Sequence, residues 1–171
     1  MALQQEPGKK TPMRPGIMTL DMASDFSLPD QSGGLDWTAA GTKLTLTELD
    51  KFMDDHSRMA IANGNVSLRE AQYKLKYLAF LTNGSGTVED CQIAITNSGG
   101  TTVHAVSPAL TIPAGGSLVA ELTFIVHQNT PGAVEYAFRA SQTTAGTDIT
   151  VESEYVGCVE RIGNYNETGP A

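Results

Sequence analysis

The chain has 171 residues, of which 40% are hydrophobic and 18% are charged. This length fits one domain of ordinary size plus an arm, and the hydrophobic content excludes a wholly disordered chain. The net charge of −8 argues against nucleic acid as the main partner, because proteins that bind it carry a basic surface. No lysine follows Lys76, so the C-terminal half is expected to present an acidic surface.

The first 30 residues contain no apolar run of seven or more, which predicts that no secretory signal is present. The longest apolar-rich stretch, residues 77–81, is far shorter than the roughly 20 residues that cross a bilayer. We therefore expect a soluble protein that is made inside a cell and has no membrane partner.

Residues 1–36 are interrupted repeatedly by proline and glycine, which predicts an extended N-terminal arm rather than a regular element. Short apolar groups within or next to this arm could fill pockets on a neighbouring subunit, and its basic residues could contact an acidic neighbour. A disordered tail is the open alternative. The candidate interaction residues are Lys9, Lys10, Arg14, Ile17, Phe26, Leu28, Leu35 and Trp37.

Residues 37–66 are predicted to be a connector that contains one helix over residues 46–61. Thr45 and Glu48 have the spacing of a capping box. Leu49, Phe52, Met53 and His56 then recur at the spacing of one helical face.

Residues 67–82 allow two interpretations. Leu68, Ala71, Leu75 and Leu78 would align on one helical face, whereas residues 73–81 also alternate with a period of two. The aromatic content favours a strand, which the turn at residues 83–86 would end.

From residue 87 onward the pattern predicts short strands separated by turns rich in glycine and proline. Such spacing is typical of an antiparallel sandwich, either immunoglobulin-like or a jelly roll, and we assign it to residues 67–171. The fold class is thus mainly β, with an arm and one short helix. The expected strands cover residues 88–95, 101–106, 109–112, 117–127, 133–141 and 148–159.

Several of these segments also resemble a known family over residues 88–156. The strand that ends in residues 95–99, the turn at residues 110–117 and the Thr130-Pro131-Gly132 turn before Tyr136 resemble immunoglobulin-like sandwich modules of bacterial surface and phage proteins. This resemblance implies a binding or spacer module. The organisation of the whole chain resembles accessory virion proteins of tailed phages, such as capsid decoration proteins.

No set of residues predicts catalysis, a cofactor or a metal. The three histidines, at positions 56, 104 and 127, lack the spacing of a zinc site, and no serine lies in a nucleophile elbow. Cys91 is expected to be a buried strand residue, and its pairing with Cys158 stays open. The carboxylates at positions 148, 152 and 154 are expected to form a solvated strand face rather than a calcium site.

These observations favour a non-enzymatic structural protein of a virion, a decoration or cement subunit that docks on a shell through its arm. Its expected partners are a major capsid or other virion protein and further copies of itself, a trimer among the options. It would be assembled in the host cytoplasm. The alternative is a module that binds carbohydrate or a host surface, in which Trp37, Tyr155 and Tyr165 would be the exposed aromatic residues.

Overall fold

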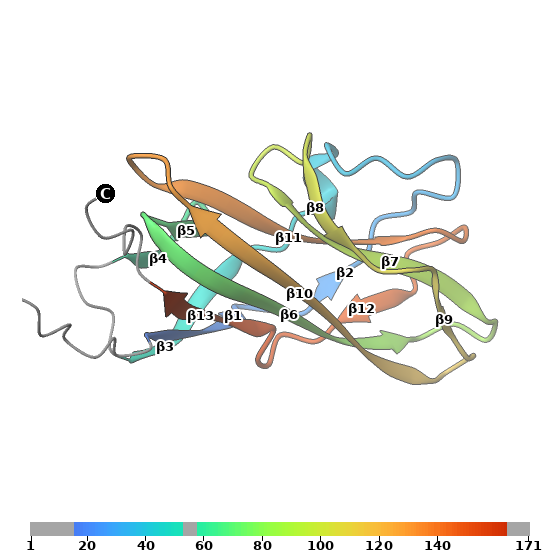
Figure 1. The fold of residues 1–171 in the computed structure, drawn as a ribbon. Helices are drawn as coiled ribbons and strands as arrows, with labels where there is room; N and C mark the ends of the chain where they lie inside the picture. Colours follow the sequence, from blue (N-terminus) through green and yellow to red (C-terminus); the bar gives the residue numbers. More distant parts are fainter. Residues whose placement is uncertain (1–15, 53–57, 164–171) are drawn as a thin grey trace, which may run out of the picture.

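A computed structural model describes residues 16–52 and 58–163 of the chain. Two antiparallel sheets lie face to face and enclose the core, so the chain folds as a β-sandwich (Figure 1). Every strand pairing within the two sheets is antiparallel. The prediction of an antiparallel sandwich is therefore confirmed.

The first sheet, called sheet A, is built around one long strand. β6 pairs with β10 along one side and with β12 and β13 along the other, and β13 continues through β1 to β3. The strands of sheet A are β1 (Ile17–Met22), β2 (Phe26–Ser27), β3 (Leu46–Phe52), β6 (Ala71–Asn83), β10 (Ser117–Gln128), β12 (Ile149–Val151) and β13 (Gly157–Gly163).

The second sheet, sheet B, has the order β4-β5-β11-β7-β8, and β9 also pairs with β7. Its far edge, β8, lies close to β10 at one side of the sandwich (Figure 1). The strands of sheet B are β4 (Met59–Ala62), β5 (Asn65–Leu68), β7 (Glu89–Asn97), β8 (Val103–Val106), β9 (Leu110–Ile112) and β11 (Val134–Gln142).

The core lies between the sheets and follows from the alternation of side chains along the strands. In β6, every second residue from Ala71 to Asn83 is buried. The rings of Tyr77 from β6 and Phe138 from β11 stack with centroids 4.5 Å apart, which joins the two sheets. Each large apolar side chain buried in this way stabilises the fold by about 1.5–3 kcal/mol.

The strand interpretation of residues 67–82 is confirmed, because β5 and β6 occupy most of this range. The turn after β7 also forms as expected. Gly100 has a φ of 76°, and a Cβ atom there would lie 2.1 Å from the carbonyl oxygen of Trp37, so this turn requires glycine.

The predicted helix over residues 46–61 is wrong wherever the structure describes this range. Residues 46–52 form β3 and residues 59–61 belong to β4, while residues 53–57 lie outside the described residues. Leu49 and Phe52 have helical spacing, but the backbone of this segment forms its hydrogen bonds with β1 and not within a helix. The spacing alone therefore gave the wrong prediction. The helical element that the described residues contain is a short 3₁₀ turn, η1 (Ala40–Thr42).

The predicted arm over residues 1–36 is wrong from residue 17 onward. β1 lies inside sheet A between β13 and β3, and its alternating Met18, Leu20 and Met22 are buried. The alternation covers only a few residues, and the prolines and glycines around it favoured the prediction of an extended arm. The leader at residues 1–15 lies outside the described residues.

The expected strand over residues 148–159 is two strands. β12 and β13 pair with different halves of β6, and the chain turns between them. Tyr155 and Gly157 both have positive φ, and a Cβ atom on Gly157 would lie 2.0 Å from the carbonyl oxygen of Lys76. A continuous strand is incompatible with this backbone.

Candidate interaction surfaces

The predicted interaction residues do not gather at one place. Leu28 is fully buried and Trp37 is only 8% exposed, so neither can fill a pocket on another subunit. Phe26 packs against the core, and Leu35 is exposed in a loop. Of the predicted residues on strands, Ile17 alone is an exposed large apolar side chain. The predicted basic residues Lys9, Lys10 and Arg14 lie outside the described residues.

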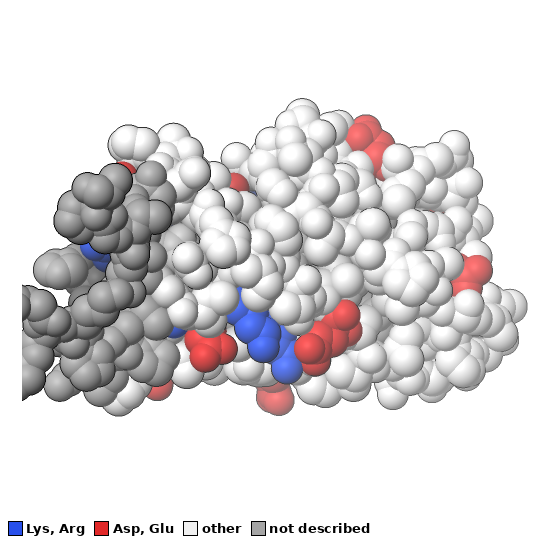
Figure 2. All heavy atoms as spheres, in the orientation of Figure 1, with Lys and Arg blue, Asp and Glu red and all other residues white. Residues whose placement is uncertain are grey.

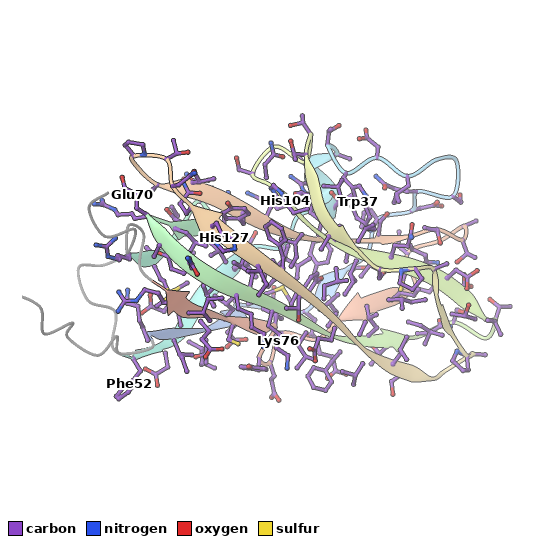
Figure 3. All side chains as sticks on the ribbon, in the orientation of Figure 1. Trp37, Phe52, Glu70, Lys76, His104 and His127 are labelled. Atoms are coloured by element: carbon purple, nitrogen blue, oxygen red, sulfur yellow. The ribbon has the colours of Figure 1, made fainter. Side chains whose placement is uncertain are left out.

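Ile17 belongs to an apolar patch at the end of the sandwich where the leader joins β1. Phe52 pairs directly with Ile17, and the end of β13 lies beside the start of β1. Leu49 and Ile162 are the unpaired residues at two register shifts, which re-aim their side chains. We call the four residues Ile17, Leu49, Phe52 and Ile162 the leader-end patch; Phe52 is the most exposed of them, at 62% (Figure 3).

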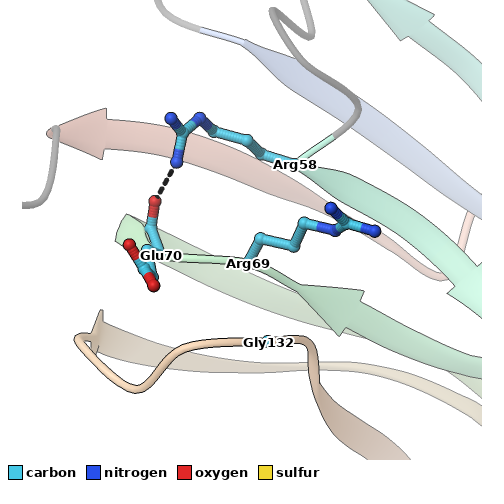
Figure 4. A pocket seen from close by; sticks show the side chains of 4 residues that line it. All are labelled: Arg58, Arg69, Glu70 and Gly132. Carbon is cyan, nitrogen blue, oxygen red and sulfur yellow. Dashed lines mark hydrogen bonds between the residues drawn. The ribbon is translucent and has the colours of Figure 1, made fainter.

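A polar hollow of about 240 Å³ opens at the same end (Figure 4). Arg58, Arg69, Glu70 and Gly132 line it, and Arg58 donates a hydrogen bond to the backbone carbonyl of Glu70. Sequence reasoning did not find these residues, because they come from three segments that are far apart in the sequence. The hollow adds two guanidinium groups to the end that carries the leader.

A second apolar surface lies on the outward side of sheet A. Phe80 of β6 and Val119 of β10 are directly paired and both are exposed. Ile125 is also exposed, further along β10 and opposite Lys74, and the ion pair of Lys76 with Glu121 lies between it and Val119. A hollow of about 260 Å³ lies beside Phe80 and Val119, and Glu152 also lines it. We call Phe80, Val119 and Ile125 the outer-face patch.

A third surface lies at the side of the sandwich where β8 and β10 meet. Val103 and Val106 of β8 are exposed there, at 43% and 46%. Beside them, the His104 ring stacks on Phe124 of β10 with centroids 4.8 Å apart. We call Val103, His104, Val106 and Phe124 the edge surface.

β10 borders both the outer-face patch and the edge surface. Among the described residues it has one strand neighbour, β6, so the backbone groups on its other side are not paired within a sheet. Natural edge strands are normally protected by proline, lysine or a short length. β10 has 12 residues with the sequence SLVAELTFIVHQ, which contains none of these protections and a single charged side chain.

Charge is sparse on this side of the molecule. Figure 2 shows few lysine, arginine, aspartate or glutamate side chains over β8 and β10. Lys76 and Glu121 form an ion pair of 3.1 Å across β6 and β10, so their charges offset one another. Apolar, weakly charged surface of this kind is typical of protein contacts.

The two cysteines and the carboxylates at positions 148, 152 and 154 all lie within the described residues. Cys91 is buried, which raises the pKa of its thiol to about 12, and Cys158 is half-buried; both are free thiols. Within residues 16–52 and 58–163, no group of three or more histidine, cysteine or acidic side chains could hold a metal ion. Asp148, Glu152 and Glu154 are all exposed.

Comparison with known proteins gives a fold and no family. No family model and no curated protein matches the chain. The solved structure of the Eiger TNF from S. frugiperda is similar, with a TM-score of 0.50 and 9% identity, and the match covers 92% of this chain and 99% of that one. A structure of infectious bursal disease virus, Gt strain, matches with a TM-score of 0.37 and 14% identity over 99% of this chain and 37% of that one, which is too distant to support an argument.

The similarity to the Eiger TNF structure favours the jelly-roll form of the sandwich over the immunoglobulin-like form. At 9% identity it shows the fold alone. In the described part of the chain, no helix is long and apolar enough to span a membrane.

Proposed function

We propose that the chain is a non-enzymatic structural subunit of a virion that assembles with copies of itself and docks on a shell. The observation that carries the proposal is the exposed apolar surface along β8 and β10, with Val119 at 54% and Ile125 at 43% exposure. These side chains add nothing to the core of a single copy. Covering them with protein is the simplest way to remove them from water.

The assembly is a closed ring of three copies, in which the edge surface of one copy packs on the outer-face patch of the next. Two different surfaces on one subunit give a head-to-tail contact, and such a contact closes into a ring when the rotation between neighbouring copies divides a full turn. Three copies make the smallest closed ring that has no twofold axis. The hollow beside Phe80 and Val119 supplies a concave seat for the aromatic and valine side chains of the edge.

Docking on the shell uses the leader end. The leader-end patch is apolar, and the arginine-lined hollow opens at the same end of the sandwich. The basic residues Lys9, Lys10 and Arg14 precede β1 in the sequence. An apolar centre with charged groups around it is the usual composition of a protein interface. The partner is a capsid or other virion protein.

Co-sedimentation with purified virion shells that lack this protein tests the docking. The full chain should pellet with the shells, and deletion of residues 1–15 or the Phe52→Asp variant should reduce pelleting by about tenfold or more. Val88→Asp is the matched control, because Val88 is exposed to a similar degree, at 58%, but lies outside the leader-end patch. Equal pelleting of all variants would contradict docking through this end.

The deletion must stop before β1. Removing residues 1–36 would take away β1, which lies between two other strands of sheet A, and the buried Leu28. That variant would lose the fold together with any docking, so it cannot separate the two.

A further inference from the structure

His104 occupies an unusual position at the edge surface. It is the unpaired residue of a register shift between β7 and β8, because Ile95 pairs with Ala105 and Thr96 pairs with Val103. Such a bulge turns a side chain out of the normal alternation. Here the ring turns toward sheet A and bridges the two sheets at the side of the sandwich (Figure 3).

Aromatic rings surround His104. Its ring stacks on Phe124 of β10 at an interplanar angle of 20°, and Tyr136 of β11 lies 5.3 Å away in a tilted arrangement. Tyr136 is the titratable group in ring contact with it, and the Tyr136 hydroxyl lies 3.4 Å from Oε1 of Gln128. Along β7, the strand paired with β8, the facing residues are Ala94, Ile95 and Thr96, which carry no charge.

Among the described residues, no carboxylate forms an ion pair with the His104 ring that could stabilise its charged form. Partial burial already lowers the pKa of His104 below its ordinary value of 6.5. The ring nevertheless lies between exposed valines at positions 103 and 106, so a neighbouring copy on the edge surface would cover it further.

We propose that His104 makes the assembly acid-sensitive, so that protonation of its ring at mildly acidic pH releases the edge surface of one copy from the outer-face patch of the next. This inference rests on the assembly proposed above. It adds a regulation of that contact, and it is independent of docking through the leader end.

The direction follows from the burial of charge. Assembly removes water from the ring, which disfavours the imidazolium and lowers the pKa of His104 further in the assembled state. The separated chain then binds more protons than the assembled one. Assembly is therefore strongest above the pKa of the separated chain and weakens as pH falls below it, by up to about tenfold for each pH unit and each subunit.

Light scattering coupled to size-exclusion chromatography tests the proposal on the full chain between about pH 7.5 and about pH 5. The wild-type mass should fall toward that of one chain as pH is lowered. His104→Phe keeps an aromatic ring against Phe124 but cannot be protonated, so its mass should stay constant. Far-UV circular dichroism at each pH confirms that the sandwich remains folded.

His127→Gln tests the other described histidine, which is exposed on the outward side of β10, the side of the outer-face patch, and lacks the ring contacts of His104. It should dissociate with acid as the wild type does. A pH-independent wild-type assembly, or dissociation of His104→Phe in parallel with the wild type, would overturn the acid response alone. A single-chain mass already at about pH 7.5 would overturn both the assembly and this inference. It would not affect docking through the leader end, which the co-sedimentation experiment tests separately.

Discussion

β6 and β10 are neighbouring strands of similar length whose outward sides differ. They pair without a register shift from Ser117 opposite Thr82 to Gln128 opposite Ala71. β6 has strands on both sides, and its outward residues include Lys74 and Lys76 as well as Phe80. β10 has one strand neighbour, and its outward residues include Val119 and Ile125, with Glu121 as its one charged side chain. Apolar residues that point inward are explained by the core, and under the proposed assembly those on the outward side of β10 are explained by contact with another copy.

The largest expected effect on stability comes from a residue that faces the core. Phe138→Ala removes the ring that stacks on Tyr77 and leaves a cavity between the sheets. We expect the free energy of unfolding to fall by about 3–5 kcal/mol. Urea unfolding followed by circular dichroism measures this change, and a loss below about 1 kcal/mol would mean that the two sheets are not joined by this pair.

The second largest effect on stability is expected from a buried polar network around Arg139. The guanidinium of Arg139, 2% exposed, donates to the Thr96 and Thr42 hydroxyls and to the carbonyls of Ala39 and Ser98, which fastens the segment around η1 to sheet B. Arg139→Met should lower the free energy of unfolding by about 3 kcal/mol, because several buried acceptors lose their donors. Lys76→Met, at a partly exposed position, is the comparison and should change it far less.

Glu89 should make stability depend on pH. Hydrogen bonds from Thr144 and Thr87 hold the pKa of its carboxyl below the ordinary 4.5. Its contribution to stability is therefore present above about pH 4.5 and is lost as pH falls through the lower pKa of the folded state. Urea unfolding at neutral pH and near pH 3 should show a smaller difference for Glu89→Gln than for the wild type. Equal pH dependence of the two would contradict this role.

The smallest effect on a single copy is expected on the outward side of β10. Ile125→Ala should change the free energy of unfolding of the separated chain by no more than about 0.5 kcal/mol, because Ile125 is 43% exposed. Urea unfolding at a protein concentration low enough to separate the copies measures this change in the stability of the single chain. A loss comparable to that of Phe138→Ala would show that Ile125 serves the fold itself.

The sequence predicts the strands of the C-terminal two thirds well because turns and alternation are local signals. Gly100 and the alternation around Ile93 are examples. Prediction from the sequence fails where residues that are far apart in the chain determine the local structure. The local spacing in β3 predicts a helix, and only its pairing with β1 shows that it is a strand. Leu28 was predicted to contact a neighbouring subunit, but the fold buries it. The exposure of Val119 and the bulge at His104 depend on which strand lies at an edge, and no local pattern contains that information.

The solution mass of the full chain at neutral pH, compared with that of Ile125→Lys, tests the central claim most directly. We predict three times the 18.1 kDa of one chain for the wild type, and a single-chain mass with an unchanged circular dichroism spectrum for Ile125→Lys. Val88→Lys, an exposed position between β6 and β7, should keep the wild-type mass. A wild type that stays at one chain mass at micromolar concentration, or an Ile125→Lys variant that assembles as the wild type does, would contradict the account.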